Sequence, residues 1–489
     1  MSRILFILSA FLMGISQQPW GLGFFAWFSF VPCIYFFDYI NNLRKVIGYA
    51  FLWGLIYHMS FLYWLSGNIG IDSIILKYFT MLLVSSFLAL NIVIIFICYF
   101  FFKKYYNNKY YLYILPLIVV SVEFLRSFGL YGFTWNSFSY SQSDYLIVSQ
   151  NIEYTGIYGL SFWIVLINVS IYTLLKQFSK IKIYILIVSF LFPWITGFII
   201  KSSSFEPSSY IKAKIIQPNI SLNEKRGNIN TSLSKLINLS TLSSNDSIDI
   251  IVWPESSISN RFLRNGGYNN KLSLNMNNFL NSNKFYLIAG LEANYEKEKF
   301  NSAAYFRGDS IINIYHKQRL VPNVEHTPEF FNKIGYNMGL TNFSIGNDLS
   351  MFSVKNIPFA SMICIESIFP NPTRLFVKNG AKFLVYIVND GWYTKPPEPQ
   401  QHAKRCIFRA IENRRSVIRC ANTGISMVVD PYGNIIHETE LNNSSIINAS
   451  IPILDRKTFY TKYGNLFSIL NLLALLFIVL TTIFKKSNS

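Results

Sequence analysis

Three side chains suited to covalent catalysis are spaced through the middle of the sequence. Each lies at an expected strand end: Glu255 in VWPES, Lys317 in YHKQRLVP, and Cys364 in MICIES. Together, a carboxylate, an amine and a thiol offer a general base, a cation for developing negative charge, and a nucleophile. Taken singly, each has a plainer explanation: a turn residue, a solvated lysine and a small buried hydrophobe. Only their order and surroundings distinguish between these interpretations.

The segment that holds these residues alternates β-rich runs with polar stretches typical of helices, notably 399–414. It extends over 210–460 and follows KSSSFEPSS at 201–209, which has the composition of a linker. This pattern predicts an α/β domain with a large internal sheet. The runs expected to form strands are IKAKIIQ, IDIIVWPES, FYLIAGL, SAAYFRG, FASMICIES, KFLVYIVND, SVIRCANTG and ISMVVD.

The remainder of the chain is apolar enough to lie in lipid. Of its 489 residues, 51% are hydrophobic and 14% are charged, whereas a soluble domain has roughly 25% charged residues. We expect seven transmembrane helices in 1–200 and an eighth in 461–489, the first being an uncleaved anchor. The apolar runs lie at 3–17, 20–39, 46–67, 78–102, 111–129, 158–175, 182–200 and 464–484.

Basic residues occupy every second short loop, which predicts the orientation of the chain. These loops are expected to be cytoplasmic, together with both termini, so that residues 201–463 lie on the opposite side of the membrane. The basic residues concerned are Arg3, Arg44, Lys45, Lys103, Lys104, Lys109, Lys176, Lys180, Lys182, Lys485 and Lys486.

The composition also argues against several partners and cofactors. The net charge of +18 is scattered between apolar runs rather than gathered in one stripe or helix, which disfavours nucleic-acid binding. The five cysteines show no metal-ligand spacing, so we expect neither a metal nor another cofactor. Since one chain contains all three candidate residues, we expect a monomer.

The order of these three residues resembles that of the nitrilase superfamily, whose members use a Glu–Lys–Cys triad. The resemblance covers most of 210–450 and rests on WPES around Glu255, on YHKQRLVP, on C-x-E from Cys364 to Glu366, and on NDGWY at 389–393. It implies an αββα sandwich in which Glu255, Lys317 and Cys364 are catalytic.

Within that superfamily, the whole chain resembles the apolipoprotein N-acyltransferase family. Further matches are QPWGLGFFAWFSFVP at 18–32, EFLRS at 123–127, GFTWNSFSYSQ at 132–142 and TGIYGLSFW at 155–163. The resemblance implies a catalytic domain on the periplasmic face of a bacterial inner membrane. It also implies phospholipid as acyl donor and an apolipoprotein with a diacylglyceryl-cysteine amino terminus as acceptor.

The resemblance also suggests supporting residues around the triad. Glu325, eight residues after Lys317, matches an acidic position that supports the lysine or the acid–base step. An ion pair that merely holds the lysine is an equally good explanation. The backbone N–H of Ile365 is a candidate second donor to an oxyanion, and Glu366 matches a further acidic position.

Trp392 and Tyr393 are candidates for the lining of a substrate pocket, with core packing as the plainer alternative. The sequence also departs from the family pattern. Ile365 stands where an aromatic residue is common, and NISLNEKRGN, with Ser221 and Arg226, replaces NIPQ followed by a nearby Trp. VPNVEHTP at 321–328 likewise replaces a VPFGEYVP-like run.

Two other functions remain open. A membrane-tethered carbon–nitrogen hydrolase would use the same three residues, but one helix suffices for tethering. A transporter with an external binding domain would need several charged residues in the middle of its spans, and the apolar runs contain few. The number of apolar runs therefore favours an enzyme that acts on lipid.

Overall fold

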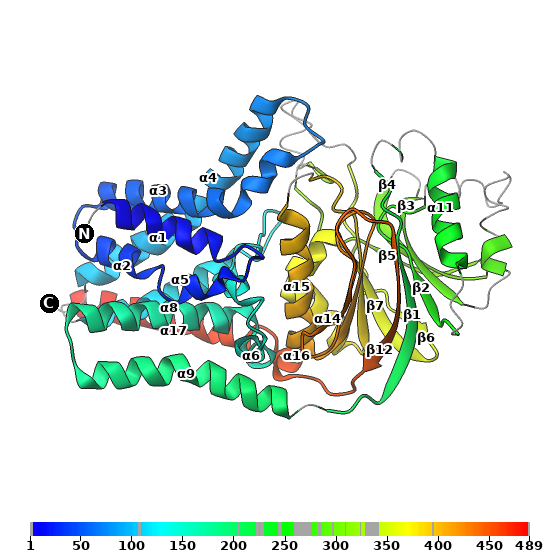
Figure 1. The fold of residues 1–489 in the computed structure, drawn as a ribbon. Helices are drawn as coiled ribbons and strands as arrows, with labels where there is room; N and C mark the ends of the chain where they lie inside the picture. The colour runs from blue at the N-terminus through cyan, green and yellow to red at the C-terminus, as the bar shows by residue number, and fades with distance from the viewer. Residues whose placement is uncertain are drawn as a thin grey trace. The chain divides into compact units, whose positions relative to one another are not determined.

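The computed structural model divides the chain into two compact units (Figure 1). The helical unit comprises Met1–Ser204, Tyr393–Pro397 and Tyr463–Ser489. The second unit comprises Phe205–Trp392 and Glu398–Lys462 and is called the catalytic unit because it contains the three candidate catalytic residues. The structure describes all residues except 1–2, 106–108, 204, 222–223, 225–228, 243–246, 259–275, 277, 282–284, 296–297, 309, 323, 328–341, 394–395 and 488–489.

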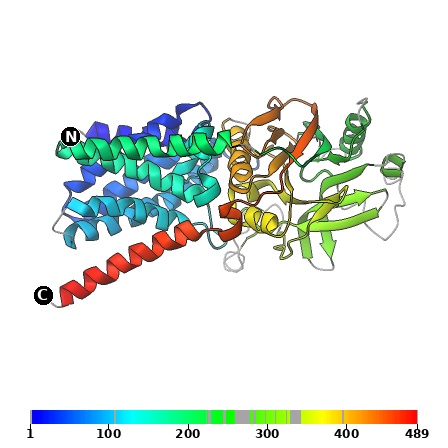
Figure 2. The same ribbon diagram turned by 90° about the horizontal axis from the view of Figure 1, so that it is seen from below.

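The helical unit is built from long apolar helices that run alongside one another (Figure 2). Short 3-10 turns interrupt several of the apolar runs, for example at Leu22–Trp27 and Tyr63–Gly67. The α-helices of this unit are α1 (Arg3–Ile15), α2 (Val31–Asp38), α3 (Leu43–Leu62), α4 (Ile74–Tyr105), α5 (Leu115–Leu125), α6 (Leu146–Ser149), α7 (Ile152–Thr155), α8 (Ile157–Lys176), α9 (Lys180–Ser202) and α17 (Leu466–Ser487).

Each of the eight apolar runs forms helix, but the runs differ in length. Among the described residues, four helical segments are long and apolar enough to cross a membrane: Leu43–Gly67, Ile74–Tyr105, Ile157–Lys176 and Lys180–Ser202. The other runs form shorter apolar helices of 10–17 residues. Only 11% of the most apolar window of α9 is buried, so this helix exposes large apolar side chains. Such a surface suits lipid rather than water, as expected of a membrane domain.

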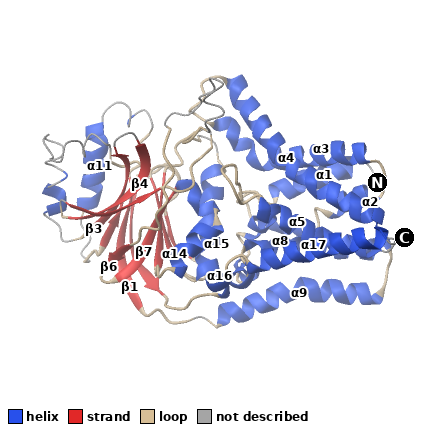
Figure 3. Cartoon of the chain, turned by 180° about the vertical axis from the view of Figure 1, so that it is seen from behind, coloured by secondary structure: helices blue, strands red, loops and turns tan. Residues whose placement is uncertain are grey.

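The catalytic unit contains two six-stranded sheets (Figure 3). Cys420 links them, because its thiol on β9 contacts the carbonyls of Ile216 and Val252 at 3.3 Å on two strands of the other sheet. The first sheet has the order β12 (Ser445–Ile453), β1 (Ser209–Gln217), β2 (Ile250–Val252), β3 (Tyr286–Tyr295), β4 (Glu298–Arg307) and β5 (Ser310–His316). The second has the order β11 (Ile435–Glu438), β10 (Met427–Val429), β9 (Ser416–Ala421), β8 (Phe383–Val388), β7 (Ile357–Ile363) and β6 (Phe352–Val354).

Helices cover the outer face of each sheet, which completes the αββα sandwich implied by the resemblance (Figures 1 and 3). On the first sheet, Leu233 and Leu236 of α11 (Ile229–Thr241) join a buried apolar cluster with Leu287 and Leu291 of β3. On the second sheet lie α14 (Pro370–Lys378) and α15 (Glu398–Asn413), the latter being the predicted helix at 399–414. A short helix, α16 (Phe459–Tyr463), precedes α17.

The centre of each sheet is parallel, and this arrangement gathers the candidate residues. Strands β1, β2 and β3 are parallel, as are β7, β8 and β9. Parallel strands end at the same edge of a sheet, where α/β proteins commonly place their sites. All eight predicted strand runs form strands, and β5 ends at the expected strand end before Lys317, but β6, β11 and β12 were not predicted.

Candidate active site

Cys364 lies at a sharp turn directly after β7. Its φ is +50°, in the left-handed region, and it begins the short 3-10 helix η6 (Cys364–Ile368). This conformation costs an L-residue about 1–2 kcal/mol and is typical of functional positions. The turn leaves Cys364 partly exposed, whereas Cys406 and Cys420 are buried. Among these three cysteines of the catalytic unit, Cys364 is therefore the residue with the most exposed surface.

Lys317 follows β5 and is held between two acidic side chains. Its Nζ lies 2.8 Å from Glu325 Oε1 and 3.4 Å from Glu255 Oε1, with 1% of the lysine side chain exposed. Burial acts to lower the pKa of Lys317, but the charges of Glu325 and Glu255 outweigh it and raise the pKa. Lys317 therefore stays cationic and can stabilise an adjacent anion.

A close backbone contact fixes the turn that carries Glu255. This residue follows β2, and the next residue, Ser256, has a φ of +54°. Gly290 of β3 passes directly beneath, where a Cβ would lie 2.6 Å from Glu255 Cα and 2.5 Å from Ser256 N. Only glycine fits this approach, so Gly290 helps to set the position of Glu255.

Asn301 joins the two acids and was missed by the sequence analysis. Its Nδ2 donates to Glu255 Oε1 at 2.8 Å and to Glu325 Oε1 at 2.9 Å. The residue is 4% exposed and lies on β4, and its backbone carbonyl accepts from Lys317 N at 2.8 Å. No local motif marks an asparagine inside FNSAAYF, because its role arises only from strand pairing.

The thiol of Cys364 is electrostatically coupled to this cluster. Burial, followed by the charge of Glu255, raises the pKa of Cys364 well above its ordinary value, while Lys317 acts in the opposite direction. The resting thiol therefore keeps its proton at neutral pH. A thiol in this state needs a base, and Glu255 is the acid whose charge acts on it most strongly.

Glu366 ties the turn at Cys364 to the loop after Lys317. Its Oε2 accepts from Ile363 N at 2.7 Å, and its Oε1 accepts from the backbone N–H groups of Gln318 at 2.8 Å and Arg319 at 3.1 Å. Tyr315 also donates to Oε1, at 2.7 Å. Because it is fully buried, Glu366 fixes the two loops relative to each other. Glu325 similarly accepts from Val321 N at 2.8 Å.

The remaining predicted residues are not all brought to this cluster. Ile365 is partly exposed directly beside Cys364. Trp392 ends a segment of the catalytic unit, but Tyr393 belongs to the helical unit, where its ring lies 4.7 Å from that of Trp64. Ser221 N donates to Glu224 Oε2 at 2.6 Å on the surface, and Arg226 lies outside the described residues.

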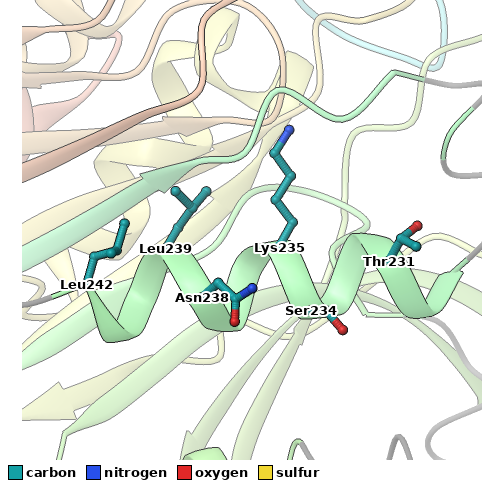
Figure 4. Close-up of a pocket in the computed structure, with 6 residues that line it drawn as sticks. All are labelled: Thr231, Ser234, Lys235, Asn238, Leu239 and Leu242. Atoms are coloured by element: carbon teal, nitrogen blue, oxygen red, sulfur yellow. The ribbon is translucent and has the colours of Figure 1, made fainter.

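The described part of the catalytic unit has surface hollows beside α11 and beside the turn at Glu255. One is a shallow groove along α11, lined by Thr231, Ser234, Lys235, Asn238, Leu239 and Leu242 (Figure 4). It contains none of the candidate catalytic residues. The other, of about 200 Å³, is lined by Pro254, Ser256 and Ser257 on either side of Glu255, and by Glu292 and Asn422. This second hollow, next to Glu255, is therefore the one that adjoins the candidate site.

Comparison with known proteins identifies the family of this chain. The model of the carbon–nitrogen hydrolase family matches residues 212–458, which is just over half of the chain. The chain therefore belongs to the carbon–nitrogen hydrolase family. A second model, that of the apolipoprotein N-acyltransferase N-terminal domain, matches residues 9–170. The nitrilase-superfamily protein Nit3 of Saccharomyces cerevisiae has a TM-score of 0.39 at 22% identity, covering 51% of this chain and 92% of its own.

Similarity to single proteins extends over nearly the whole chain. The apolipoprotein N-acyltransferase of Rickettsia typhi is 31% identical over 496 residues, which cover 96% of each chain. That of Geobacter metallireducens is 27% identical over 487 residues, covering 94% of this chain and 91% of its own. The chain therefore belongs to the apolipoprotein N-acyltransferase family.

Proposed function

We propose that this protein transfers a fatty acyl group from a phospholipid to the α-amino group of an N-terminal diacylglyceryl-cysteine on an apolipoprotein. The observation that carries the proposal is Lys317, held between Glu255 and Glu325 beside a thiol on a strained turn. The apolar helices and the family match support a lipid donor rather than a soluble one.

In the first half-reaction, Glu255 takes the proton of Cys364, and the thiolate attacks the ester carbonyl of the phospholipid. Lys317 and the backbone N–H of Ile365 stabilise the tetrahedral oxyanion. Losing one such donor typically costs about 3–4 kcal/mol of transition-state stabilisation. The intermediate collapses as Glu255 returns the proton to the departing glycerol oxygen. The products are a lysophospholipid and an acyl thioester on Cys364.

In the second half-reaction, the neutral α-amino group of the acceptor attacks the thioester. Glu255 takes the proton that the nitrogen loses, an amide bond forms, and the carbon–sulfur bond breaks. Glu255 then returns the proton to Cys364. Throughout this cycle Lys317 keeps its 2.8 Å contact with Glu325, which explains why two acids are present for one lysine.

We further propose eight transmembrane spans, with both termini in the cytoplasm and the catalytic unit in the periplasm. Basic residues at the ends of α4 (Lys103 and Lys104) and α8 (Lys176) support this orientation. A membrane-impermeant thiol reagent should modify a cysteine introduced at Ser203 in intact cells, but not one introduced at Gln177. Labelling in the opposite pattern would refute the proposed topology.

The acyl-enzyme is the decisive test of the chemistry. Purified protein incubated with phospholipid alone should gain the mass of one fatty acyl group on the peptide that carries Cys364. Neutral hydroxylamine should release it, and a diacylglyceryl-cysteine peptide should convert it to an amide. Cys364→Ala should form no adduct, whereas Cys406→Ala, which alters a buried thiol, should form it normally.

A carbon–nitrogen hydrolase would give a different result. Water would clear the adduct, and free fatty acid would appear at the same steady rate with or without acceptor. Acceptor-independent release of that kind, or an adduct that persists in Cys364→Ala, would contradict the acyltransferase proposal.

A further inference from the structure

A second cluster of buried polar side chains lies behind Cys364. Asp390 follows β8, Glu398 and His402 lie on α15, and Arg419 lies on β9. All four are 4% exposed or less. The sequence analysis gave none of them a role, and the proposed reaction does not use them. Buried charged groups are costly unless they are paired, so their arrangement calls for a physical explanation.

These side chains form a connected column that ends at the nucleophile. Arg419 Nη2 donates to Asp390 Oδ2 at 2.6 Å, and Asp390 Oδ1 lies 2.9 Å from His402 Nδ1. His402 Nε2 lies 3.1 Å from the backbone carbonyl oxygen of Cys364. Glu398 Oε1 lies farther from His402 Nδ1, at 3.7 Å. The carbonyl that His402 contacts thus belongs to the residue with the strained φ of +50°.

Both contacts of His402 require the imidazole to donate. A carboxylate and a backbone carbonyl are acceptors, and a neutral imidazole carries only one N–H. With a single proton, one of the two short contacts would set a nitrogen lone pair against an oxygen lone pair. The geometry is satisfied when each ring nitrogen holds a proton, which gives the imidazole a positive charge.

The surrounding groups act on His402 in both directions. Burial and Arg419 lower the pKa of His402 and outweigh Asp390 and the contact with Cys364, which raise it, so it is the two acceptors, and not the balance of charges, that call for a proton on each ring nitrogen. Burial, followed by the charge of Asp390, raises the pKa of Glu398 well above its usual range, which favours its neutral form. If His402 carries both protons, it and Arg419 are positive and Asp390 is negative, which leaves the column with about one positive unit. Asp390 by itself acts to raise the pKa of Cys364, so the protons on His402 decide the sign of the column's effect.

The same assignment of protons and charges argues against a metal ion bound by this cluster. Atoms of Asp390, Glu398 and His402 lie within 4.8 Å of one another, a spacing that suits a metal site. However, the guanidinium of Arg419 already pairs with Asp390, and a doubly protonated His402 has no lone pair to offer. The side chains of Arg419 and His402 therefore supply the positive charge that a metal ion would otherwise bring to this cluster.

We propose that His402 is a positioning residue that keeps a proton on each ring nitrogen and, anchored through Asp390 to Arg419, clamps the carbonyl of Cys364. The clamp holds the strained turn so that the thiol faces Glu255. It also places a positive charge behind the nucleophile, where the low dielectric of the interior makes that charge effective. The proposal rests on the proposed function only in taking Cys364 as the nucleophile.

The protonation state is measurable in the unmodified protein. With ¹⁵N-labelled histidine, the chain gives signals from five residues, and His402 is assigned as the signal lost in His402→Gln. Both of its ring nitrogens should show the chemical shifts of protonated nitrogens between pH 6 and 8. A single protonated nitrogen over that range would overturn the proposal. The spectrum is recorded on the unmodified protein, and a folded variant is needed only to assign the signal of His402. The result therefore holds even if other substitutions reduce stability.

The effect on the nucleophile is measurable without any lipid substrate. The alkylation rate of Cys364 by iodoacetamide, mapped by mass spectrometry, reports the thiolate fraction as pH rises. His402→Gln keeps an amide N–H for the carbonyl but loses the charge, and it should shift this profile upward by about one pH unit, or tenfold at fixed pH. The exposed His437→Gln on β11 is the matched control and should leave the profile unchanged.

A merely structural role predicts another outcome. In that case His402→Gln would lower the thermal midpoint while the pH profile of Cys364 alkylation stayed at its wild-type position, and the proposal would fail. Neither measurement depends on acyl transfer. A failure of the acyltransferase proposal, seen as no acyl adduct on Cys364, would therefore be distinguishable from a failure of the clamp.

Discussion

Each unit of the molecule contains a buried cluster of acids and lysines, and the two clusters balance their charges differently. In the helical unit, Asp38 at the end of α2 accepts from Tyr172 at 2.5 Å and forms an ion pair with Lys176. Lys103 donates to the backbone carbonyl of Asp38 at 2.5 Å. One acid here faces two lysines, together with hydroxyl donors from neighbouring helices.

The catalytic unit reverses this ratio, since Lys317 lies between Glu255 and Glu325. If Glu255 accepts a proton, Lys317 still has a charged partner at 2.8 Å. If Asp38 accepted one, Lys176 would lose its charged partner, whereas Lys103 would keep its contact with the backbone carbonyl of Asp38. The difference suggests that a buried acid can serve as a base when a second acid also pairs with the lysine. When it is the only acid in its cluster, it instead stabilises the packing of the elements around it.

The largest expected effect comes from removing the base. Glu255→Gln keeps the shape of the side chain but cannot accept the thiol proton, so acylation of Cys364 should slow by about 10²–10⁴-fold. Stopped-time mass spectrometry of the thioester measures this rate. Glu224→Gln, which changes a surface acid, should acylate at the wild-type rate. Near-normal acylation of Glu255→Gln would assign the base to another group.

A smaller loss is expected when the two acids are uncoupled. Asn301→Ala removes the hydrogen bonds to Glu255 and Glu325 at 2.8 and 2.9 Å and should lower kcat about 10–100-fold, since each bond to a charged group contributes about 1.5–3 kcal/mol. KM for phospholipid should change little. The exposed Asn294→Ala on the neighbouring strand is the control. A change confined to KM would mean that Asn301 contacts substrate instead.

The smallest effect on catalysis is expected at Asp38. Asp38→Asn removes the charge that pairs with Lys176 and weakens the acceptor for Tyr172, so it should destabilise the helical unit by about 1–3 kcal/mol. Thermal unfolding in detergent should show a lower midpoint, with acyl transfer per folded molecule unchanged. If transfer is lost at an unchanged midpoint, the contrast between the two clusters is wrong.

The sequence indicated the candidate site residues more readily than the framework that positions them. Glu255, Lys317 and Cys364 were identifiable because their types, order and flanking motifs are local. The strand end before Lys317 was expected, but the extent of β5 was not, because its residues Ser310–Ile314 are half-buried or exposed and carry no clear pattern. Asn301 was missed because its two partners are 46 and 24 residues away in the chain.

The same limit applies to His402 and to the helical unit. A histidine in a polar helix gives no sign that its two ring nitrogens meet Asp390 and the carbonyl of Cys364. In the helical unit, the eight apolar runs were recognisable by composition, but their helical lengths were not. Short 3-10 turns such as Leu22–Trp27, and Pro116 at the start of α5, shorten the regular helices.

At position 364, the left-handed turn makes stability and activity favour different residues. Glycine adopts a φ of +50° without a Cβ penalty, so Cys364→Gly would relieve about 1–2 kcal/mol of strain while deleting the nucleophile. A library selected only for resistance to heat would therefore drift toward glycine at this position and lose the enzyme. Directed evolution of a sturdier variant has to select for turnover in every round.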